Sequence, residues 1–321
     1  MGDVRDVPDP AIIKAGDHYY VFATEPGIAI LRSDDLWEWE KIGTVLPDSL
    51  PRWAQEEVPG TQFPWAPDIS FFGDRYHLYY ALSTFGGQRS VIALATNRTL
   101  DPDDPDYRWI DRGVVVESNP GVDPFNAIDP AIVQDEQGRV WMAWGSFWGG
   151  IKMRRIDPAT GKVFAADTTT YSLAARAGTD AVRGPRDDQA IEGPYIIHHD
   201  DYYWLFASFD ACCRGAESTY NVRVGRSENV TGPYVDRDGM PMTEGGGALV
   251  LAGRGQIAGP GHNSILIDGD RHFIVHHFVN IAEGPASPEA PLAIPRSLQI
   301  RPLYWAWDGW PIAGEPIAGP Q

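Results

Sequence analysis

The amino-acid sequence predicts an all-β protein, a five-bladed β-propeller with four strands in each blade. The main observation is a hairpin pattern, two short apolar runs around a turn, which occurs five times along the 321 residues. The five copies open at Asp9, Asp68, Asp129, Glu192 and His262, so successive starts lie 59, 61, 63 and 70 residues apart. A near-constant period of this length is typical of repeat architectures in which each repeat forms one blade.

Each hairpin is followed by further β-type runs that supply the outer strands of its blade. These runs are 27–33, 37–46, 90–97, 107–118, 151–158, 220–227, 232–236 and 297–311. No long amphipathic helical pattern competes with them, although 168–178 could hold one or two helical turns. A sixth blade would need another copy of the hairpin, and no linker divides the chain, so we expect residues 1–321 to form a single propeller domain.

The charge balance restricts the classes of partner. The chain has 26 basic and 44 acidic residues, a formal net charge of −18. Such a surface repels polyanions, so nucleic acid, an anionic membrane and a polyuronate are poor partners. A neutral or cationic ligand is compatible with it, although acidity that only confers solubility explains the charge equally well. No apolar run approaches the roughly 18 residues of a membrane helix.

Two features bear on the cellular compartment. Cys212 and Cys213 are adjacent, and because a bridge between neighbours would be strained and no zinc spacing is present, we predict two packed thiols. The N-terminal segment MGDVRDVPDP lacks the basic and apolar regions of a signal peptide. The protein is therefore either cytoplasmic or secreted after removal of a leader, and the sequence leaves both possibilities open.

Four of the five repeats open with a carboxylate. The first strand of a blade normally lies innermost, so these side chains should converge at one mouth of the central channel. Clustered carboxylates raise each other's pKa, and a protonated carboxyl beside an ionised one can serve general acid and base catalysis. The structural alternative is that each repeated acid only ties the start of its strand.

Seven segments, in order along nearly the whole chain, carry a resemblance to a known family: VPDPAIIK, WAPDISFF, NAIDPAIV, GSFWGGI, IEGPYII, CCRGAESTY and GPGHNS. They resemble the family 43 glycoside hydrolases, and within these most closely the arabinanases. The resemblance implies a five-bladed propeller that hydrolyses glycosidic bonds with inversion, using three carboxylates at the channel.

The resemblance also implies a role for each carboxylate. Asp9 would be the general base that activates water, and Glu192 the general acid that protonates the leaving oxygen. Asp129 would orient the acid and modulate its pKa. An inverting site places acid and base roughly 6.5–9.5 Å apart, which leaves room for the water. Pro8 departs from many relatives, which have His there, and this puts contacts near the base in doubt.

Two other repeat openings remain. Asp68 has no catalytic role in the family, so we expect either a structural or a sugar-contacting residue. His262 matches an arabinanase GHN motif whose His lies near a hydrated calcium or other ion in the channel, and a plain hydrogen-bonded histidine is the alternative. Calcium prefers oxygen ligands, so we expect a water molecule to bridge the ion to His262 rather than a direct bond between the ion and the imidazole. No organic cofactor is expected.

Residues flanking the hairpin strands are candidates for sugar binding, because sugars need flat apolar surfaces and polar edges. The aromatic candidates are Trp65, Phe85, Phe147 and Trp148, and the polar candidates are Asn126 and Ser146. Aromatic residues inside the strands are expected to pack between blades instead; these are Tyr19, Tyr20, Tyr79, Tyr80, Trp141, Tyr202, Tyr203 and Trp204.

The sequence thus predicts an inverting endo-arabinanase that hydrolyses α-1,5-linked L-arabinofuranosyl chains, a neutral polysaccharide compatible with the acidic surface. Alternatives within the family are an exo-acting arabinanase, an arabinofuranosidase and a β-xylosidase. A non-catalytic sugar- or protein-binding propeller is a further alternative, which the presence of all three carboxylates disfavours. Endo or exo action depends on loop shape, which the sequence does not reveal, and neither does it reveal chain-length preference or oligomeric state.

Overall fold

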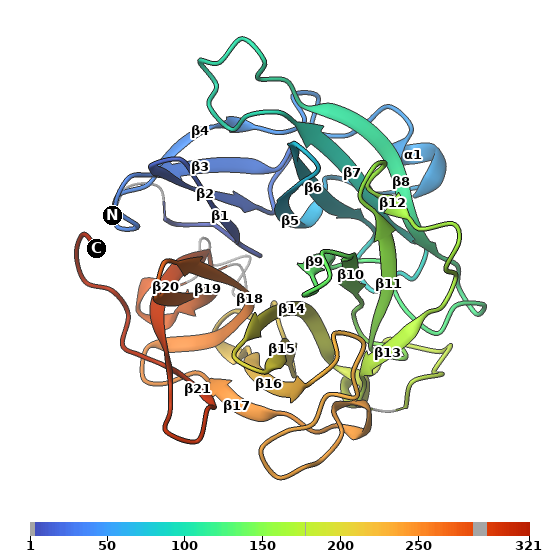
Figure 1. Cartoon of the computed structure of the whole chain (residues 1–321), viewed down its shortest axis with the longest axis vertical. Helices are drawn as coiled ribbons and strands as arrows, with labels where there is room; N and C mark the ends of the chain where they lie inside the picture. Colours follow the sequence, from blue (N-terminus) through green and yellow to red (C-terminus); the bar gives the residue numbers. More distant parts are fainter. Residues whose placement is uncertain (1–3, 177, 285–293) are drawn as a thin grey trace.

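The computed structural model describes residues 4–176, 178–284 and 294–321, which form five antiparallel sheets arranged around a central axis (Figure 1). In every sheet the first strand lies innermost and the later strands lie further out. Four sheets have the predicted four strands, whereas the third has five, because two short strands both pair with its third strand. Each sheet is therefore one blade, and the predicted all-β five-bladed propeller is confirmed.

Blade 1 contains β1 (Ala11–Ala15), β2 (His18–Ala23), β3 (Ala29–Ser33) and β4 (Glu40–Thr44), and blade 2 contains β5 (Trp65–Phe72), β6 (Arg75–Leu82), β7 (Ser90–Asn97) and β8 (Ile110–Ser118). Blade 3 contains β9 (Ala131–Gln134), β10 (Val140–Trp144), β11 (Ile151–Asp157), β12 (Lys162–Val163) and β13 (Tyr171–Ala174). Blade 4 contains β14 (Ile191–His199), β15 (Tyr202–Phe209), β16 (Asn221–Ser227) and β17 (Ala248–Leu251), and blade 5 contains β18 (Ile257–Asp268), β19 (Arg271–Asn280), β20 (Arg296–Trp305) and β21 (Pro311–Ala313).

Among the described residues, helical structure is limited to α1 (Ala54–Glu57) and four single turns, η1 (Asp187–Gln189), η2 (Gly215–Glu217), η3 (Met242–Glu244) and η4 (Ile281–Glu283). Within the ranges given above, no helix has the length and apolarity needed to cross a membrane.

The inner hairpin of each blade forms where the sequence has two apolar or aromatic runs around a tight turn. In blade 2, β5 and β6 are joined by Gly73 and Asp74, whose φ angles are +55° and +71°. A two-residue turn of this kind has the twist that antiparallel strands need, and Gly and Asp tolerate the left-handed backbone. All five predicted hairpins are paired strands in the structure.

Two outer segments differ from the sequence prediction. Residues 232–236 do not form the fourth strand of blade 4; Val235 makes only isolated bridges, and β17 takes that place. Pro233 has no N–H to donate to a ladder, which limits the pairing of this segment. Within the predicted 168–178 segment, residues 171–174 form strand β13 rather than a helical turn, and Leu173 is buried in the core shared by blades 3 and 4.

Hydrophobic clusters fill the space between all five pairs of neighbouring blades. Tyr20 and Tyr80 meet in the cluster between blades 1 and 2, and Trp204 lies in the cluster between blades 4 and 5. The strand aromatics predicted to pack between blades are buried there, with Tyr202 only partly buried. Each fully buried large apolar side chain stabilises the fold by about 1.5–3 kcal/mol.

A ring of hydrogen bonds connects the blades near their innermost strands. At all five junctions, an amide near the start of one blade donates to a side chain of the preceding blade. The pairs, donor first, are Ala66 N to Thr24 Oγ1 (2.7 Å), Ile132 N to Asp68 Oδ2 (3.0 Å), Gly193 N to Asp129 Oδ2 (3.1 Å), His262 N to Ser208 Oγ (2.8 Å) and Asp9 N to His277 Nδ1 (3.0 Å). A buried amide without a partner costs about 1–3 kcal/mol, so these bonds hold neighbouring blades in one position relative to each other.

The two ends of the chain close the propeller between blades 5 and 1, where Figure 1 shows them near each other. Val7 N donates to Arg296 O (2.8 Å), which joins the N-terminal segment to the start of β20. At the other end Gln321 N donates to Asp35 O (3.1 Å) in blade 1. The termini thus fix the first and last blades to each other.

Asp68 is a structural member of this ring. Its side chain is buried, and burial raises its pKa from 3.8 to about 7, although the amides of Ile132 and Ile69 oppose the rise. The folded protein therefore binds the Asp68 proton more tightly than the unfolded chain does. By linkage, the contribution of this residue to stability falls as pH rises from about 4 to about 7.

We expect Asp68→Asn to remove this pH dependence, because the amide oxygen can still accept from Ile132 N but does not ionise. Between pH 4 and pH 8 the wild type should lose stability relative to Asp68→Asn, by on the order of a few kcal/mol. Urea unfolding at a series of pH values measures the difference. A difference that stays constant across this range would contradict the assignment.

Candidate active site

A cavity of about 800 Å³ lies where the inner hairpins begin and is lined by residues of all five blades or their connecting loops. Its volume is in the upper part of the range for ligand sites, about 300–1,000 Å³. Of the residues singled out from the sequence it is lined by Asp9, Trp65, Phe85, Asn126, Asp129, Ser146, Phe147, Trp148, Glu192 and His262. Asp68 is not among its lining residues, which favours the structural alternative for that side chain.

Asp9 precedes β1 with a left-handed backbone, φ 54°, a conformation that Asp adopts more readily than most residues. Its Oδ2 accepts a hydrogen bond from Thr24 Oγ1 at 2.6 Å, and its Oδ1 lies 3.4 Å from His262 Nδ1 and 3.9 Å from Arg296 Nη1. Burial alone would raise the pKa of Asp9. His262, His277 and Arg296 outweigh it and hold the pKa well below its usual range, so Asp9 is ionised.

Asp129 precedes β9 with the same backbone conformation, φ 58°. Its side chain is 5% exposed, and Oδ2 is the acceptor for Gly193 N in the ring of inter-blade bonds. Burial is the largest cause that raises the pKa of Asp129 well above its usual range, followed by the nearby carboxylates of Glu192 and Asp9. Asp129 and Asp9 are thus two buried acids with opposite protonation preferences.

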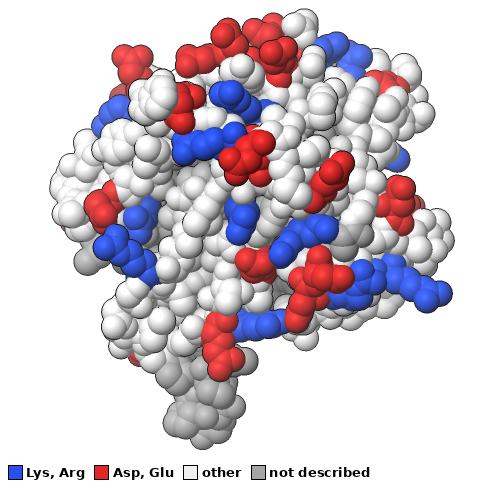
Figure 2. All heavy atoms as spheres, turned by 90° about the horizontal axis from the view of Figure 1, so that it is seen from below, with Lys and Arg blue, Asp and Glu red and all other residues white. Residues whose placement is uncertain are grey.

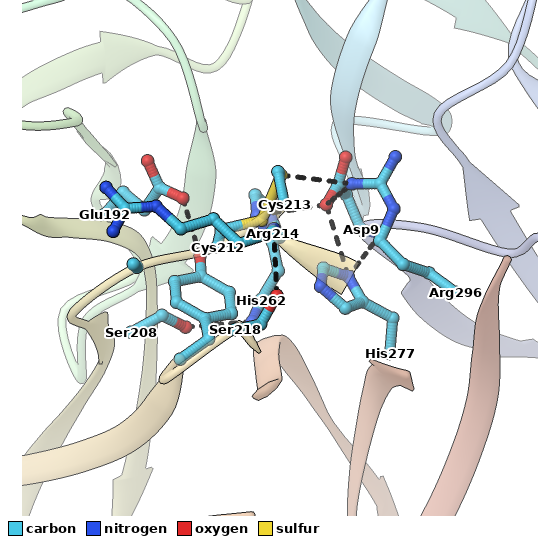
Figure 3. The surroundings of a disulfide bond; sticks show 12 residues. Asp9, Glu192, Ser208, Cys212, Cys213, Arg214, Ser218, His262, His277 and Arg296 are labelled. Carbon is cyan, nitrogen blue, oxygen red and sulfur yellow. Dashed lines mark hydrogen bonds and ion pairs between the residues drawn. A yellow bond between two sulfur atoms is a disulfide. The ribbon is translucent and has the colours of Figure 1, made fainter. Parts of the chain in front are cut away.

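Glu192 lies in β14, next to Gly193, and both of its carboxyl oxygens have hydroxyl donors. Ser146 Oγ donates to Oε2 at 2.7 Å, and Tyr220 Oη donates to Oε1 at 2.9 Å. The side chain is only half-buried, so it reaches the cavity while its orientation is fixed from two sides. Asp9 and Glu192 face the cavity from different blades (Figure 3).

The two polar residues predicted to bind hydroxyl groups already have protein partners. Ser146 holds Glu192, as described, and Asn126 Nδ2 donates to Gly87 O at 3.3 Å. Both are buried, although they line the cavity. Their observed contacts therefore hold parts of the cavity wall in place, and the contact of Ser146 orients the carboxylate of Glu192.

Aromatic side chains form part of the cavity wall. Phe85 is 89% exposed, Trp65 and Phe147 are half-buried, and Trp148 is 4% exposed. Trp148 is held against Gly184, where an added Cβ would lie 3.2 Å from the indole ring. Rings that stay accessible inside a cavity can cover the apolar face of a ligand.

His262 lines the cavity and contacts Asp9, but it lacks protein partners for a directly bound ion. In the part of the chain that the structure describes, no group of three or more His, Cys, Asp or Glu side chains could hold a metal. The neighbouring Asn263 is buried and neither its amide nitrogen nor its amide oxygen has a protein partner. Such polar atoms are usually satisfied by water, so the residues fit only an ion held through water molecules.

The two cysteines differ from the prediction of packed thiols. Cys212 and Cys213 form a disulfide between neighbours, and both line the cavity. Their Cα atoms are 3.8 Å apart, and Cys213 adopts a left-handed backbone with φ 66°. The sequence argument failed because it treated the local geometry as fixed, whereas the 211–220 loop adapts its backbone to the bond.

Several residues of the site were missed from the sequence. These are Thr24, Tyr220, His277 and Arg296, which contact Asp9 or Glu192. Thr24 and His277 lie at the ends of predicted hairpins, and Tyr220 ends the CCRGAESTY segment, so their positions carried a signal. Arg296 carried none, because only the closure of blade 5 onto blade 1 brings it to Asp9.

Comparisons with known proteins agree with this geometry. The family model for glycosyl hydrolases family 43 matches residues 4–311. An extracellular exo-α-(1→5)-L-arabinofuranosidase of Cellvibrio japonicus is 40% identical over 315 residues, 97% of this chain and 87% of that protein. An extracellular endo-α-(1→5)-L-arabinanase of Bacillus subtilis is 35% identical over 307 residues, 94% of this chain and 86% of that protein.

Among solved structures, an α-L-arabinanase of Cellvibrio cellulosa complexed with arabinohexaose superimposes with a TM-score of 0.88. It is 38% identical, and the match covers 97% of this chain and 96% of that chain. The sequence resemblance is thereby confirmed over almost the full length of the propeller. The chain belongs to glycosyl hydrolases family 43.

Proposed function

We propose that the protein is an inverting hydrolase of α-1,5-linked L-arabinofuranosyl chains. The observation that carries the proposal is the pair of cavity carboxylates with different surroundings, an ionised Asp9 beside Arg296 and two histidines, and a Glu192 held by two hydroxyl donors. Relatives named as arabinanases or arabinofuranosidases support the substrate class. A neutral chain also suits the net charge of −18, and the face in Figure 2 has acidic and basic side chains interspersed.

In this proposal Asp9 is the general base and Glu192 the general acid. Water attacks the anomeric carbon and gives a proton to Asp9, while the glycosidic C–O bond breaks and the leaving oxygen takes a proton from Glu192. Attack opposite to the leaving group inverts the anomeric configuration. Asp129 is a positioning residue, because it binds the amide of Gly193 next to the acid and its proton affinity depends on the charge of Glu192.

We expect Glu192→Gln to lower kcat on linear arabinan by about 10²–10⁴-fold, the usual contribution of a positioned general acid. Binding of substrate should be largely retained, because Gln keeps the shape and can still contact Tyr220. Initial rates and oligosaccharide binding by calorimetry measure the two effects. Glu136→Gln, the same change at an exposed turn of blade 3, is the matched control and should be active. Half the wild-type activity in Glu192→Gln would remove this residue from the mechanism.

Within that activity we propose endo action. The cavity is larger than one pentose requires, and the accessible Trp65 and Phe85 can contact sugar units on a chain that continues beyond the cleaved bond. Binding energy from such remote units can be used in the transition state. Exo action is the second candidate, supported by the name of the Cellvibrio japonicus relative at 40% identity.

For endo action we expect short oligosaccharides as the first products of debranched arabinan, and a higher kcat/KM on this polymer than on an aryl arabinofuranoside. Chromatography of products over the first minutes distinguishes the modes. Arabinose as the only early product would establish exo action instead. Faster cleavage of xylo-oligosaccharides than of arabinan would overturn the substrate while leaving the acid and base in place.

We also propose that a calcium or similar ion is held through water near His262. The support is the unpartnered, buried amide of Asn263, the next residue in β18, and the preference of hard cations for oxygen ligands, water included. Dialysis against a chelator should lower the melting temperature by a few degrees and calcium should restore it, since a ligand that binds only the folded state stabilises it. An unchanged melting temperature, with no metal in the purified protein by elemental analysis, would leave a plain hydrogen-bonded histidine.

Finally, we propose that the protein is secreted. Two similar enzymes are extracellular by name, and an accessible disulfide persists in oxidising compartments. Arabinan-degrading activity should therefore appear in the culture medium of the producing cells, with little in the washed cells. Activity confined to the cell lysate would contradict secretion.

A further inference from the structure

The Cys212–Cys213 disulfide forms part of the cavity wall. Figure 3 shows it between Glu192 and Asp9, and both cysteines belong to the cavity wall. Cys213 is exposed and Cys212 half-buried, although a disulfide is an apolar group. An apolar group that remains accessible in a cavity also lined by Asp9, Asp129 and Glu192 needs an explanation.

Stabilisation of the fold does not supply one. A disulfide stabilises a protein mainly by closing a loop in the unfolded chain, and the effect grows with the number of residues enclosed. A bond between neighbours encloses almost none. The loop is also held without it, because Ala211 O accepts from Thr219 N at 3.0 Å and from Tyr220 N at 3.1 Å, and Ser218 Oγ accepts from Arg214 N at 2.9 Å.

The disulfide and its loop contact residues that hold each of the two proposed catalytic carboxylates. Arg296 Nη1 donates to Cys213 Sγ at 3.7 Å and lies 3.9 Å from Asp9 Oδ1, so the bond adjoins the proposed base. The same loop leads to Tyr220, whose hydroxyl donates to Glu192. The two cysteines therefore line the same cavity as the proposed acid and base, and Cys213 contacts the arginine beside the base.

We infer that the Cys212–Cys213 disulfide is a substrate-contacting platform that covers an apolar face of the sugar bound between Glu192 and Asp9. This inference rests on the proposed function for the identity of the sugar. A disulfide has no donor and no rotatable S–H, so it presents one rigid, poorly hydrated surface. The C–H face of a sugar ring is complementary to that surface, whereas two thiols would present weak donors in variable orientations.

The test measures binding in the inactive Glu192→Gln background, where affinity is separated from catalysis. The purified protein should show no free thiol after unfolding in denaturant. Titration calorimetry with a linear arabino-oligosaccharide compares the intact disulfide with Cys212→Ala/Cys213→Ala and Cys212→Ser/Cys213→Ser. We expect Kd to rise about tenfold in the Ala pair and at least as much in the Ser pair, with melting temperatures within a few degrees of the parent.

A second measurement covers the case in which a double variant does not fold. Reduction of the Glu192→Gln protein by a phosphine should raise Kd to a similar extent, and reoxidation should restore it. Within the Glu192-containing enzyme, the Ala pair should raise KM more than it lowers kcat on aryl arabinofuranoside. If the disulfide only positioned Tyr220 and Glu192, kcat and its pH profile would change instead.

The outcomes distinguish failure of the disulfide platform from failure of the proposed hydrolase function. Unchanged Kd in the double variants and after reduction, or two free thiols in the purified protein, overturns the platform and leaves the proposed hydrolase standing. No oligosaccharide binding by Glu192→Gln with its disulfide intact rejects the proposed substrate, and with it a platform for that sugar.

Discussion

The hydrogen bond from an amide at the start of each blade to a side chain of the preceding blade is the constraint on which the structure depends. It occurs at all five junctions, with hydroxyl, carboxylate and imidazole acceptors. Because the donor is always main chain, the acceptor can vary while the geometry is retained. This freedom lets one repeated position serve both the fold and the chemistry.

The repeated carboxylates divide accordingly. Asp68 and Asp129 both accept amides of the next blade, but only Asp129 also lines the cavity. Asp9 and Glu192 instead accept from the hydroxyls of Thr24, Ser146 and Tyr220. Neither of the latter carboxylates accepts a main-chain amide of the next blade, which leaves both available for proton transfer.

Surroundings rather than residue type then set the protonation of these acids. Asp9 and Asp129 have the same chemistry, the same left-handed backbone and similar burial. His262, His277 and Arg296 of blade 5 lower the pKa of Asp9, whereas burial and two neighbouring carboxylates raise that of Asp129. A propeller produces such contrasts readily, because each blade contributes different side chains to a common centre.

In the cavity wall, polar and apolar side chains also have different roles. Polar side chains such as Ser146 and Asn126 are used to hold the site together, so accessible contact area comes from Trp65, Phe85 and the cysteine pair. Apolar surfaces pack against the C–H faces of an uncharged sugar chain. They do not require its hydroxyl groups to have one particular arrangement. The proposed neutral substrate and the apolar wall are therefore consistent with each other.

By itself the sequence determined the five hairpins, the blade count and the convergence of Asp9, Asp129 and Glu192, since periodic apolar runs are local signals. It also determined the family, through segments that stay contiguous in the chain. Only the tertiary structure decided that Asp68 lies outside the cavity, that Arg296 reaches Asp9, and that Cys212 and Cys213 are bonded. These depend on how the last blade closes on the first and on how one loop bends, and such contacts between distant or adaptable segments leave no periodic pattern in the sequence.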